Sequence, residues 1–216
     1  MDERVAQIPA GSETLEGNLS IPDRARAVIL FAHGSGSSRH SPRNRFVARV
    51  LNDAGLATLL TDLLTADEEE VDEVTRHLRF DITLLAQRLV AITDWLAVQP
   101  EAQEMRIGYF GASTGAAAAL VAAAERPAVV GAIVSRGGRP DLAGPALPRV
   151  RAPTLLIVGG NDFPVLELNR QALRELRAEA ELSIVPGATH LFEEPGALEE
   201  VARLSAQWFT RHLGGG

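Results

Sequence analysis

Residues 105–125 read MRIGYFGASTGAAAALVAAAE, an apolar run, a glycine–serine turn and an alanine-rich run in succession. The apolar run predicts a buried strand, and the alanine-rich run predicts a helix. Between them lie Gly111, Ser113 and Gly115, in a turn so tight that only small residues fit two positions on either side of the serine. Such a turn raises the serine hydroxyl above the sheet edge. We therefore expect Ser113 to be a nucleophile; a serine that merely suits a tight turn is the alternative.

Strand-like and helix-like runs alternate on both sides of this turn. Buried strands are predicted at residues 27–32, 56–64, 129–134, 154–158 and 182–185, and helices at 44–54, 71–97 (with a break near 80–81), 166–180 and 198–213. Residues 5–8 and 14–21 predict an antiparallel hairpin at a sheet edge, and residues 65–70 predict an acidic loop. This order predicts an α/β fold, a mostly parallel sheet with helices on both faces. The short proline-containing segment 143–151 stands where a lid domain could have been inserted, so we expect no lid.

The composition is that of an ordinary globular domain. The chain has 216 residues, 46% of them hydrophobic and 23% charged, so we expect one domain over residues 1–216. Its net charge of −7 argues against a nucleic-acid partner, which would need a basic face. No signal pattern and no run long enough to span a membrane are evident, so we expect a cytoplasmic protein without a membrane partner.

Two missing residue types exclude several kinds of catalytic site. The chain has no cysteine, which excludes disulfides, a cysteine nucleophile and thiolate metal sites. It also has no lysine, which excludes a P-loop lysine and Schiff-base chemistry. Metal-binding spacings such as H-E-x-x-H are missing as well, so we expect no metal.

A candidate acid and a candidate base follow later strands, in the chain order serine, acid, histidine. Asp162 follows the strand predicted at 154–158, and His190 follows the strand predicted at 182–185. Because functional groups of parallel α/β sheets gather at the carboxyl ends of the strands, we expect both to lie near Ser113. His190 would take the proton of the serine hydroxyl. Asp162 would accept the other ring N–H and stabilise the imidazolium that forms.

Both residues also have a simpler interpretation. Asp162 follows two glycines and an asparagine, so it could be a turn former or the N-cap of the next helix. His190 could be a surface histidine in a loop. Asp62, at the end of a central strand, is a weaker candidate for the acid and more simply bonds to backbone there. The chain order of the three residues favours the catalytic interpretation.

The oxyanion of an acyl-transfer reaction needs fixed N–H donors. The backbone N–H of Thr114, at the start of the predicted helix, is one candidate. The glycine–serine loop at 33–38 supplies the other, through the N–H of Ser35 or, as the less favoured choice, of Gly36. His33, at the start of this loop, is expected to have a structural hydrogen-bonding role.

Candidate substrate contacts are Gly36, His40, Arg136 and Arg139. Gly36 lets the backbone approach a substrate closely, and His40 lies just past the same loop. Arg136 and Arg139 follow a strand end beside the serine turn, where a guanidinium could bind a substrate carboxylate through two hydrogen bonds. Surface salt bridges are the alternative for both arginines.

Four motifs resemble, in order, the lidless, dienelactone-hydrolase-like branch of the α/β-hydrolases: FAHGSG at 31–36, GASTG at 111–115, GGND at 159–162 and PGATH at 186–190. The resemblance covers about residues 5–213. It implies the α/β-hydrolase fold, a triad of Ser113, Asp162 and His190, and an oxyanion hole made by the N–H groups of Ser35 and Thr114. Dienelactone hydrolases proper use a cysteine where this chain has Ser113, which moves the expected activity toward a general carboxylesterase.

We therefore expect a serine hydrolase that cleaves carboxylic esters through an acyl-enzyme on Ser113, without a cofactor. The missing lid implies an open pocket, suited to short acyl esters or small lactones. The alternatives are an acyltransferase or perhydrolase with the same triad and a non-catalytic ligand-binding module. A peptidase is a weaker candidate because no domain that could grip a peptide is evident. The natural substrate and the oligomeric state are left open.

Overall fold

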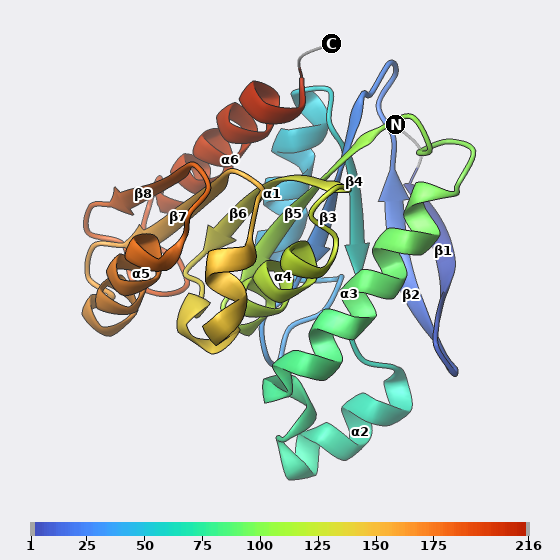
Figure 1. The fold of residues 1–216 in the computed structure, drawn as a ribbon, viewed down its shortest axis with the longest axis horizontal. Coiled ribbons are helices and arrows are strands. Elements are labelled where there is room, and N and C mark those ends of the chain that lie inside the picture. The colour runs from blue at the N-terminus through green and yellow to red at the C-terminus, as the bar shows by residue number, and fades with distance from the viewer. Residues whose placement is uncertain (1–2, 215–216) are drawn as a thin grey trace.

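An eight-stranded sheet forms the centre of the computed structural model, which describes residues 3–214 (Figure 1). The strands are β1 (Glu3–Ala10), β2 (Glu13–Ser20), β3 (Ala27–Ala32), β4 (Ala57–Thr61), β5 (Arg106–Ala112), β6 (Val130–Arg136), β7 (Thr154–Gly159) and β8 (Ala180–Val185). Their order in the sheet is β1-β2-β4-β3-β5-β6-β7-β8. β1 and β2 form the predicted antiparallel hairpin at the edge, β2 pairs antiparallel with β4, and all other pairs are parallel.

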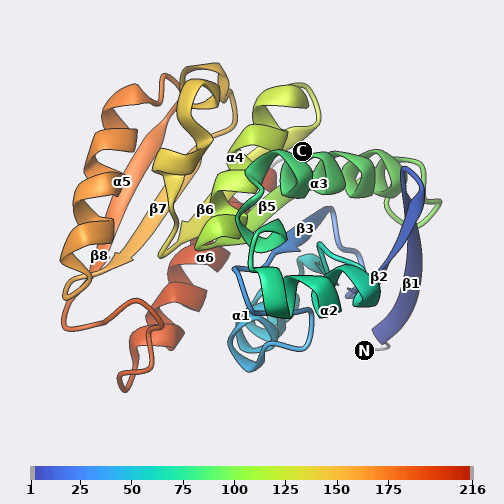
Figure 2. The ribbon, with the colours of Figure 1, turned by 90° about the horizontal axis from the view of Figure 1, so that it is seen from below.

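Helices cover both faces of the sheet, as predicted (Figure 2). One face packs against α1 (Pro42–Asp53) and α6 (Ala197–Leu213). The other packs against α3 (Ile82–Ala97), α4 (Thr114–Glu125) and α5 (Phe163–Glu175). The central strands are buried almost throughout because they are covered on both sides, which is why they are continuous apolar runs in the sequence. The predicted α/β-hydrolase architecture is thereby confirmed.

The acidic segment after β4 is a helix, so the predicted loop at 65–70 is wrong. α2 (Ala66–Thr75) begins after Thr65, whose hydroxyl accepts from the N–H of Glu68 (3.2 Å) while the Glu68 carboxylate accepts from the N–H of Thr65 (2.8 Å). This reciprocal capping box satisfies two N–H groups that a helix start leaves free. The first turn also carries three acidic residues, which the positive end of the helix dipole stabilises.

The other boundaries differ from the prediction by a few residues. The helix predicted at 71–97 is in fact three elements: the end of α2, the 3-10 turn η1 (Leu78–Phe80) and α3. The predicted break falls at Asp81, the N-cap of α3. α5 begins at Phe163, earlier than predicted, with a proline in its first turn, a position that suits the fixed φ of proline. The segment expected in place of a lid lies mostly within η2 (Pro140–Arg149), short 3-10 turns joined at Gly144. Within the described residues, no helix has the length and apolar character needed to cross a membrane.

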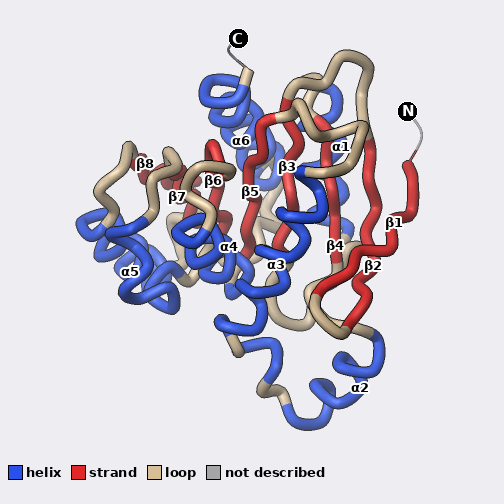
Figure 3. Tube along the Cα trace, turned by 45° about the vertical axis from the view of Figure 1, so that its right-hand side comes forward, coloured by secondary structure: helices blue, strands red, loops and turns tan. Residues whose placement is uncertain are grey.

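The path of the chain around β3 determines where a site can form. From β3 the chain passes through α1 to β4 on one side, and it later returns to β5 on the other side of β3. The connections that leave β3 and β5 therefore run to opposite faces, and a crevice opens between them at the carboxyl edge of the sheet. α2 lies beyond this edge, away from the two layers of helices (Figures 1 and 3).

Candidate active site

Ser113 lies in a strained turn between β5 and α4. Its backbone has φ = 50° and ψ = −120°, a conformation that residues with a side chain rarely adopt and that costs on the order of 1–3 kcal/mol. The flanking glycines make the turn possible. A Cβ on Gly111 would lie 2.4 Å from the Cα of Ala116, and a Cβ on Gly115 would lie 2.3 Å from the carbonyl oxygen of Ala32. The steric need for glycine on both sides, which the sequence predicted, is therefore confirmed.

The loop after β6 holds this turn from the side. The N–H of Ser113 donates to the carbonyl of Arg136 (3.3 Å), and the carbonyl of Ser113 accepts from the N–H of Arg139 (3.1 Å). Gly137 lies next to Arg136, and a Cβ on it would be 3.5 Å from Cε1 of His190. The imidazole of His190 therefore lies against the same loop that holds the serine.

His190 and Asp162 form a hydrogen-bonded pair. The Nδ1 of His190 lies 2.7 Å from Oδ2 of Asp162. Asp162 stands at the N-cap position of α5, yet its side chain makes no capping hydrogen bond, so its carboxylate serves the histidine instead. The Asp162 side chain is 12% exposed and that of His190 is 39% exposed. With Nδ1 held by the largely buried Asp162, Nε2 is the nitrogen available to act as a base.

The serine and the histidine share one loop cluster but are not bonded directly. Within residues 3–214, no hydrogen bond joins the hydroxyl of Ser113 to His190. Catalytic hydrogen bonds are often long before a substrate binds and tighten only in the reacting complex. The direct bond between these two side chains stays a prediction.

The two predicted oxyanion donors are linked by a side chain. The N–H of Ser35 donates to Oγ1 of Thr114 (3.0 Å). Thr114 is the first residue of α4, where backbone N–H groups have no acceptor within the helix. The loop before Ser35 packs directly on the serine turn, since a Cβ on Gly34 would lie 3.1 Å from the Cβ of Ser113. The Thr114 hydroxyl thus takes the hydrogen bond that the oxyanion would need.

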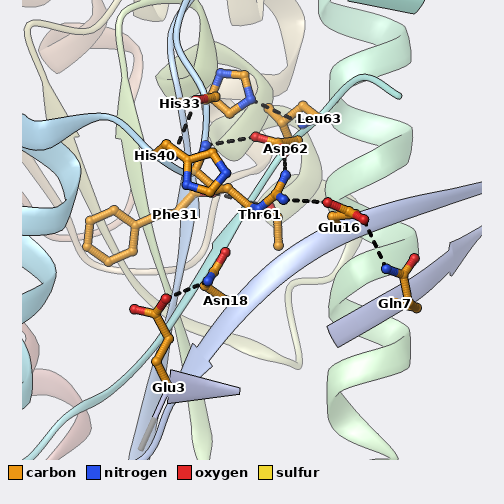
Figure 4. A network of polar contacts seen from close by, with 12 residues as sticks. Glu3, Gln7, Glu16, Asn18, Phe31, His33, His40, Thr61, Asp62 and Leu63 are labelled. Atoms are coloured by element: carbon orange, nitrogen blue, oxygen red, sulfur yellow. Dashed lines mark hydrogen bonds and ion pairs between the residues drawn. The ribbon is translucent and has the colours of Figure 1, made fainter. Parts of the chain in front are cut away.

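His33 is buried just after β3 and fixes this loop (Figure 4). Its Nε2 accepts from the N–H of Leu63 (3.1 Å), so Nδ1 carries the proton and donates to the carbonyl of Gly34 (3.0 Å). Burial lowers the pKa of His33 and keeps the ring neutral. The structural role predicted for His33 is confirmed.

Asp62, the weaker candidate for the acid, belongs to a separate network (Figure 4). It accepts from the backbone N–H of Arg39 (2.7 Å) and forms an ion pair with the Arg39 guanidinium, which also pairs with Glu16 of the hairpin. Both carboxylate oxygens of Asp62 therefore serve Arg39. Asp62 fixes the loop after β3 to the hairpin and is not the partner of His190.

A cavity of about 500 Å³ opens beside the oxyanion loop. Ser35 and Thr114 line one side of it, and Arg43 at the start of α1 lines another. Gly36 and His40, the predicted substrate contacts of this loop, also line the cavity. The predicted oxyanion donors thus face a space that can hold a small molecule.

The remaining wall comes from α2 and η1, which sequence reasoning missed. Glu69, Asp72 and Glu73 contribute to it, together with Arg79, which is paired with Asp72. Burial, followed by repulsion from the charge of Asp62, raises the pKa of Glu69. The capping-box pattern at the start of α2 is the signal that could have identified a helix at this position.

The two candidate arginines after β6 have different surroundings. Arg139 forms two hydrogen bonds with the carboxylate of Asp141 (2.9 and 2.7 Å), which is the surface salt bridge considered as its alternative. Arg136 is buried, and among the residues that the structure describes its Nε and Nη1 have no hydrogen-bond acceptor. Neither arginine lines the cavity beside Ser35.

The chain resembles two proteins of known sequence or structure closely. It is 62% identical to a dienelactone hydrolase from Anabaena variabilis, over 98% of both chains and with a TM-score of 0.97. It is 58% identical over 214 residues to a Mycobacterium tuberculosis protein named as a candidate phosphoribosyl transferase. That match covers 99% of this chain but 47% of the relative, so the chain spans about half the length of the curated relatives it matches.

A more distant likeness concerns the fold alone. Est1E from Butyrivibrio proteoclasticus has a TM-score of 0.82 at 16% identity, over 98% of this chain and 99% of its own. The sequence model of the dienelactone hydrolase family matches residues 15–212, nearly the whole chain. The chain therefore belongs to the dienelactone hydrolase family.

Proposed function

We propose that the chain is a serine hydrolase that cleaves carboxylic esters through an acyl-enzyme on Ser113. The observation that carries the proposal is the strained backbone of Ser113 beside the hydrogen-bonded pair of His190 and Asp162. Backbone strain of this kind is found at functional sites, and a strained serine at a helix N-terminus supports the role of a nucleophile. Ser113, Asp162 and His190 are the proposed triad.

The proposed reaction has two steps, acylation of Ser113 and hydrolysis of the acyl-enzyme, and the same residues act in both. Ser113 Oγ attacks the ester carbonyl while Nε2 of His190 takes its proton, and Asp162 stabilises the imidazolium through Nδ1. The backbone N–H groups of Ser35 and Thr114 would bind the oxyanion, which requires the Thr114 hydroxyl to release the N–H of Ser35. His190 then protonates the leaving alcohol. Water, activated by the same imidazole, releases the acid from Ser113.

The size of the cavity supports a small substrate. Its volume of about 500 Å³ suits a short acyl ester or a small lactone. The serine at position 113, where dienelactone hydrolases proper have cysteine, favours a general carboxylesterase. No cofactor enters this reaction, and a single domain over residues 1–216, a cytoplasmic location and the lack of a nucleic-acid partner stay predictions.

The name of the M. tuberculosis relatives concerns proteins about twice as long as this chain. This chain matches about half of each relative. The candidate site described above lies in that half, and its residues suit acyl chemistry. We therefore extend the hydrolase proposal, and not the transferase name, to this chain.

The test is the loss of activity on removal of one hydroxyl. Ser113→Ala is expected to abolish turnover of p-nitrophenyl acetate and labelling by a fluorophosphonate, whereas Ser12→Ala in the β1–β2 turn should change neither. Unchanged turnover in Ser113→Ala, or a label on another residue, would refute the assignment. Product analysis with a competing alcohol or peroxide separates hydrolysis from acyl transfer and perhydrolysis. No turnover of any ester by the wild-type chain would favour a binding module.

A further inference from the structure

A second cavity lies at the edge of the sheet opposite to Ser113. It has a volume of about 580 Å³, and it is formed by the end of α4, the segment between η2 and β7, and the loop between α5 and β8. α4, η2 and α5 lie side by side on one face of the sheet (Figure 2). Ser113 precedes α4 and Ala124 lies near its end, so the cavity is about 16 Å from the serine turn along the helix. The proposed reaction therefore does not use this cavity.

Among the residues that the structure describes, three arginines and no acidic side chain line this cavity. Arg149 and Arg151 come from the segment before β7, and Arg177 comes from the loop before β8. Val150, between the first two arginines, is 2% exposed and has an extended backbone (φ −62°, ψ 126°). Side chains alternate along an extended segment, so a buried Val150 directs both neighbouring arginines to the outer side. Two guanidinium groups therefore share one wall, and Arg177 supplies a third from a separate segment.

The three guanidinium groups are not neutralised by the described part of the protein. Within residues 3–214, none of them forms an ion pair or a side-chain hydrogen bond, and all three are exposed, so a ligand can reach them from solvent. Glu175 and Glu179 are the acids closest to Arg177 along the chain, but neither lines the cavity. Glu179 pairs instead with Arg211 of α6 (2.9 Å). Positive charge thus gathers at this cavity although the whole chain has a net charge of −7.

We propose that this cavity binds a small molecule that carries a di- or triphosphate group. A guanidinium donates parallel hydrogen bonds to two phosphate oxygens, and three such groups match the several negative charges of an oligophosphate. The volume lies within the range of small-molecule sites. A nucleic acid would need a basic face that extends well beyond one cavity. The rest of the lining is apolar and would contact the uncharged part of the ligand; it consists of Ala124, Pro127, Pro148, Val150 and Ala178.

The alternative role of these arginines is structural. Arg149 is the last residue of η2, and Arg177 follows the last residue of α5 by two positions. A cation at the end of a helix stabilises the negative end of the helix dipole. That role concerns each helix end separately. It does not account for Arg151, which precedes a strand, or for the meeting of three cations around one cavity.

Calorimetric titration of the wild-type chain with sodium pyrophosphate and with ADP tests the proposal directly. Arg177→Gln is expected to raise the Kd of both ligands by roughly 10- to 100-fold, the range of one lost charge-assisted hydrogen bond. Arg151→Gln, on the other wall, should have the same effect. Arg174→Gln is the matched control, because Arg174 is an exposed cation in the last turn of α5 that does not line the cavity. Its Kd values should stay within about twofold of the wild type, since salt screens a charge that does not contact the ligand.

Inorganic phosphate and AMP show what a single phosphate group contributes. Weaker binding of these two than of pyrophosphate and ADP supports an oligophosphate site. Within that result, equal Kd values for pyrophosphate and ADP mean that the phosphate chain alone is recognised, and a lower Kd for ADP means that the apolar wall also contributes. The proposal is overturned if neither pyrophosphate nor ADP binds at millimolar concentration, if inorganic phosphate binds as tightly as pyrophosphate, or if Arg177→Gln keeps the wild-type Kd.

Thermal unfolding separates a ligand site from the structural role. A ligand that binds only the folded chain raises the melting temperature, so ADP should raise that of the wild type and of Arg174→Gln more than that of Arg177→Gln. A lower melting temperature of Arg177→Gln without ligand, and no shift with ADP in any protein, would show that the arginines only stabilise helix ends. If Arg177→Gln does not fold, Arg151→Gln gives the same comparison.

The proposal is independent of the reaction at Ser113, and the same titration shows this. Ser113→Ala should bind pyrophosphate and ADP with the wild-type Kd, whether or not the wild-type chain hydrolyses esters. A large loss of binding in Ser113→Ala would place the ligand at the serine turn and contradict the proposed cavity.

Discussion

Asp62 and Asp162 are the same residue type at the same edge of the sheet, yet their partners differ. Each follows a parallel strand, and each has a side chain that is 12% exposed. Asp62 pairs with the guanidinium of Arg39, whereas Asp162 pairs with the imidazole of His190, the side-chain type that most often serves as a general acid or base. The basic partner therefore decides what each carboxylate can do. The first pair can only hold loops together, while the second can take part in proton transfer.

Asp162→Asn should have the largest effect on activity, because it alters the carboxylate that pairs with His190. An amide can still bond to Nδ1, but it favours the wrong tautomer of His190 and cannot stabilise an imidazolium. We expect kcat for p-nitrophenyl acetate to fall by about 10,000-fold, with a urea unfolding midpoint close to that of the wild type. A loss of activity smaller than about tenfold would mean that Asp162 is not the acid of the triad.

Asp62→Asn should show the opposite pattern. Arg39 would keep only Glu16, whose side chain is about half exposed, so a largely buried guanidinium would lose its main partner. We expect the free energy of unfolding, measured in urea, to fall by about 3 kcal/mol while kcat stays within a few-fold of the wild type. Full stability with abolished turnover would instead place Asp62 in the catalytic machinery.

The fold and the pairing of Asp162 with His190 could be predicted from the sequence because each depends on local patterns. The turn at Ser113 needs Gly111 and Gly115 for steric reasons that hold wherever a strand enters a helix so sharply. The chain order of serine, acid and histidine, with each residue after a buried run, made Asp162 a better candidate for the acid than Asp62. Their separate partners, which only the structure shows, agree with that order.

Features that depend on distant contacts were not predictable. The acidic wall of the cavity requires α2 to fold back beyond the sheet edge, which the residues of α2 alone do not indicate. Arg136 and Arg139 look equivalent in the sequence. Asp141, two residues from Arg139, pairs with it, whereas Nε and Nη1 of the buried Arg136 have no hydrogen-bond acceptor within the described residues. The charge that repels Arg136 comes from Arg43, more than ninety positions earlier in the chain.

Thr114→Val tests whether the region of Asp62 affects catalysis at Ser113, because it removes a hydrogen bond that joins the two regions. The Thr114 hydroxyl accepts from the N–H of Ser35, and so joins the loop that Asp62 holds to the turn that carries Ser113. Valine keeps the shape and removes the acceptor that positions the N–H of Ser35. We expect the loss of this positioning to outweigh the release of the N–H for the oxyanion, so kcat should fall about tenfold with little change in KM, as for one lost neutral hydrogen bond. Thr114→Ser should retain the wild-type rate. A faster valine variant would show that the hydroxyl only competes with the oxyanion for that N–H.

His33→Gln should have the smallest effect, and it is visible only in the pH dependence of stability. Burial holds the pKa of His33 below its ordinary value of 6.5, while the charge of Asp62 opposes this shift. Below about pH 6.5 the unfolded chain therefore binds a proton that the folded chain does not, so stability falls as the pH drops toward the lower pKa of the folded state. The slope due to one such group is at most about 1.4 kcal/mol per pH unit. Urea titrations between pH 4 and pH 8 should give a shallower slope for His33→Gln than for the wild type. Parallel curves would mean that another group carries the acid sensitivity, and that the neutral ring of His33 is not what ties the loop after β3 to Leu63.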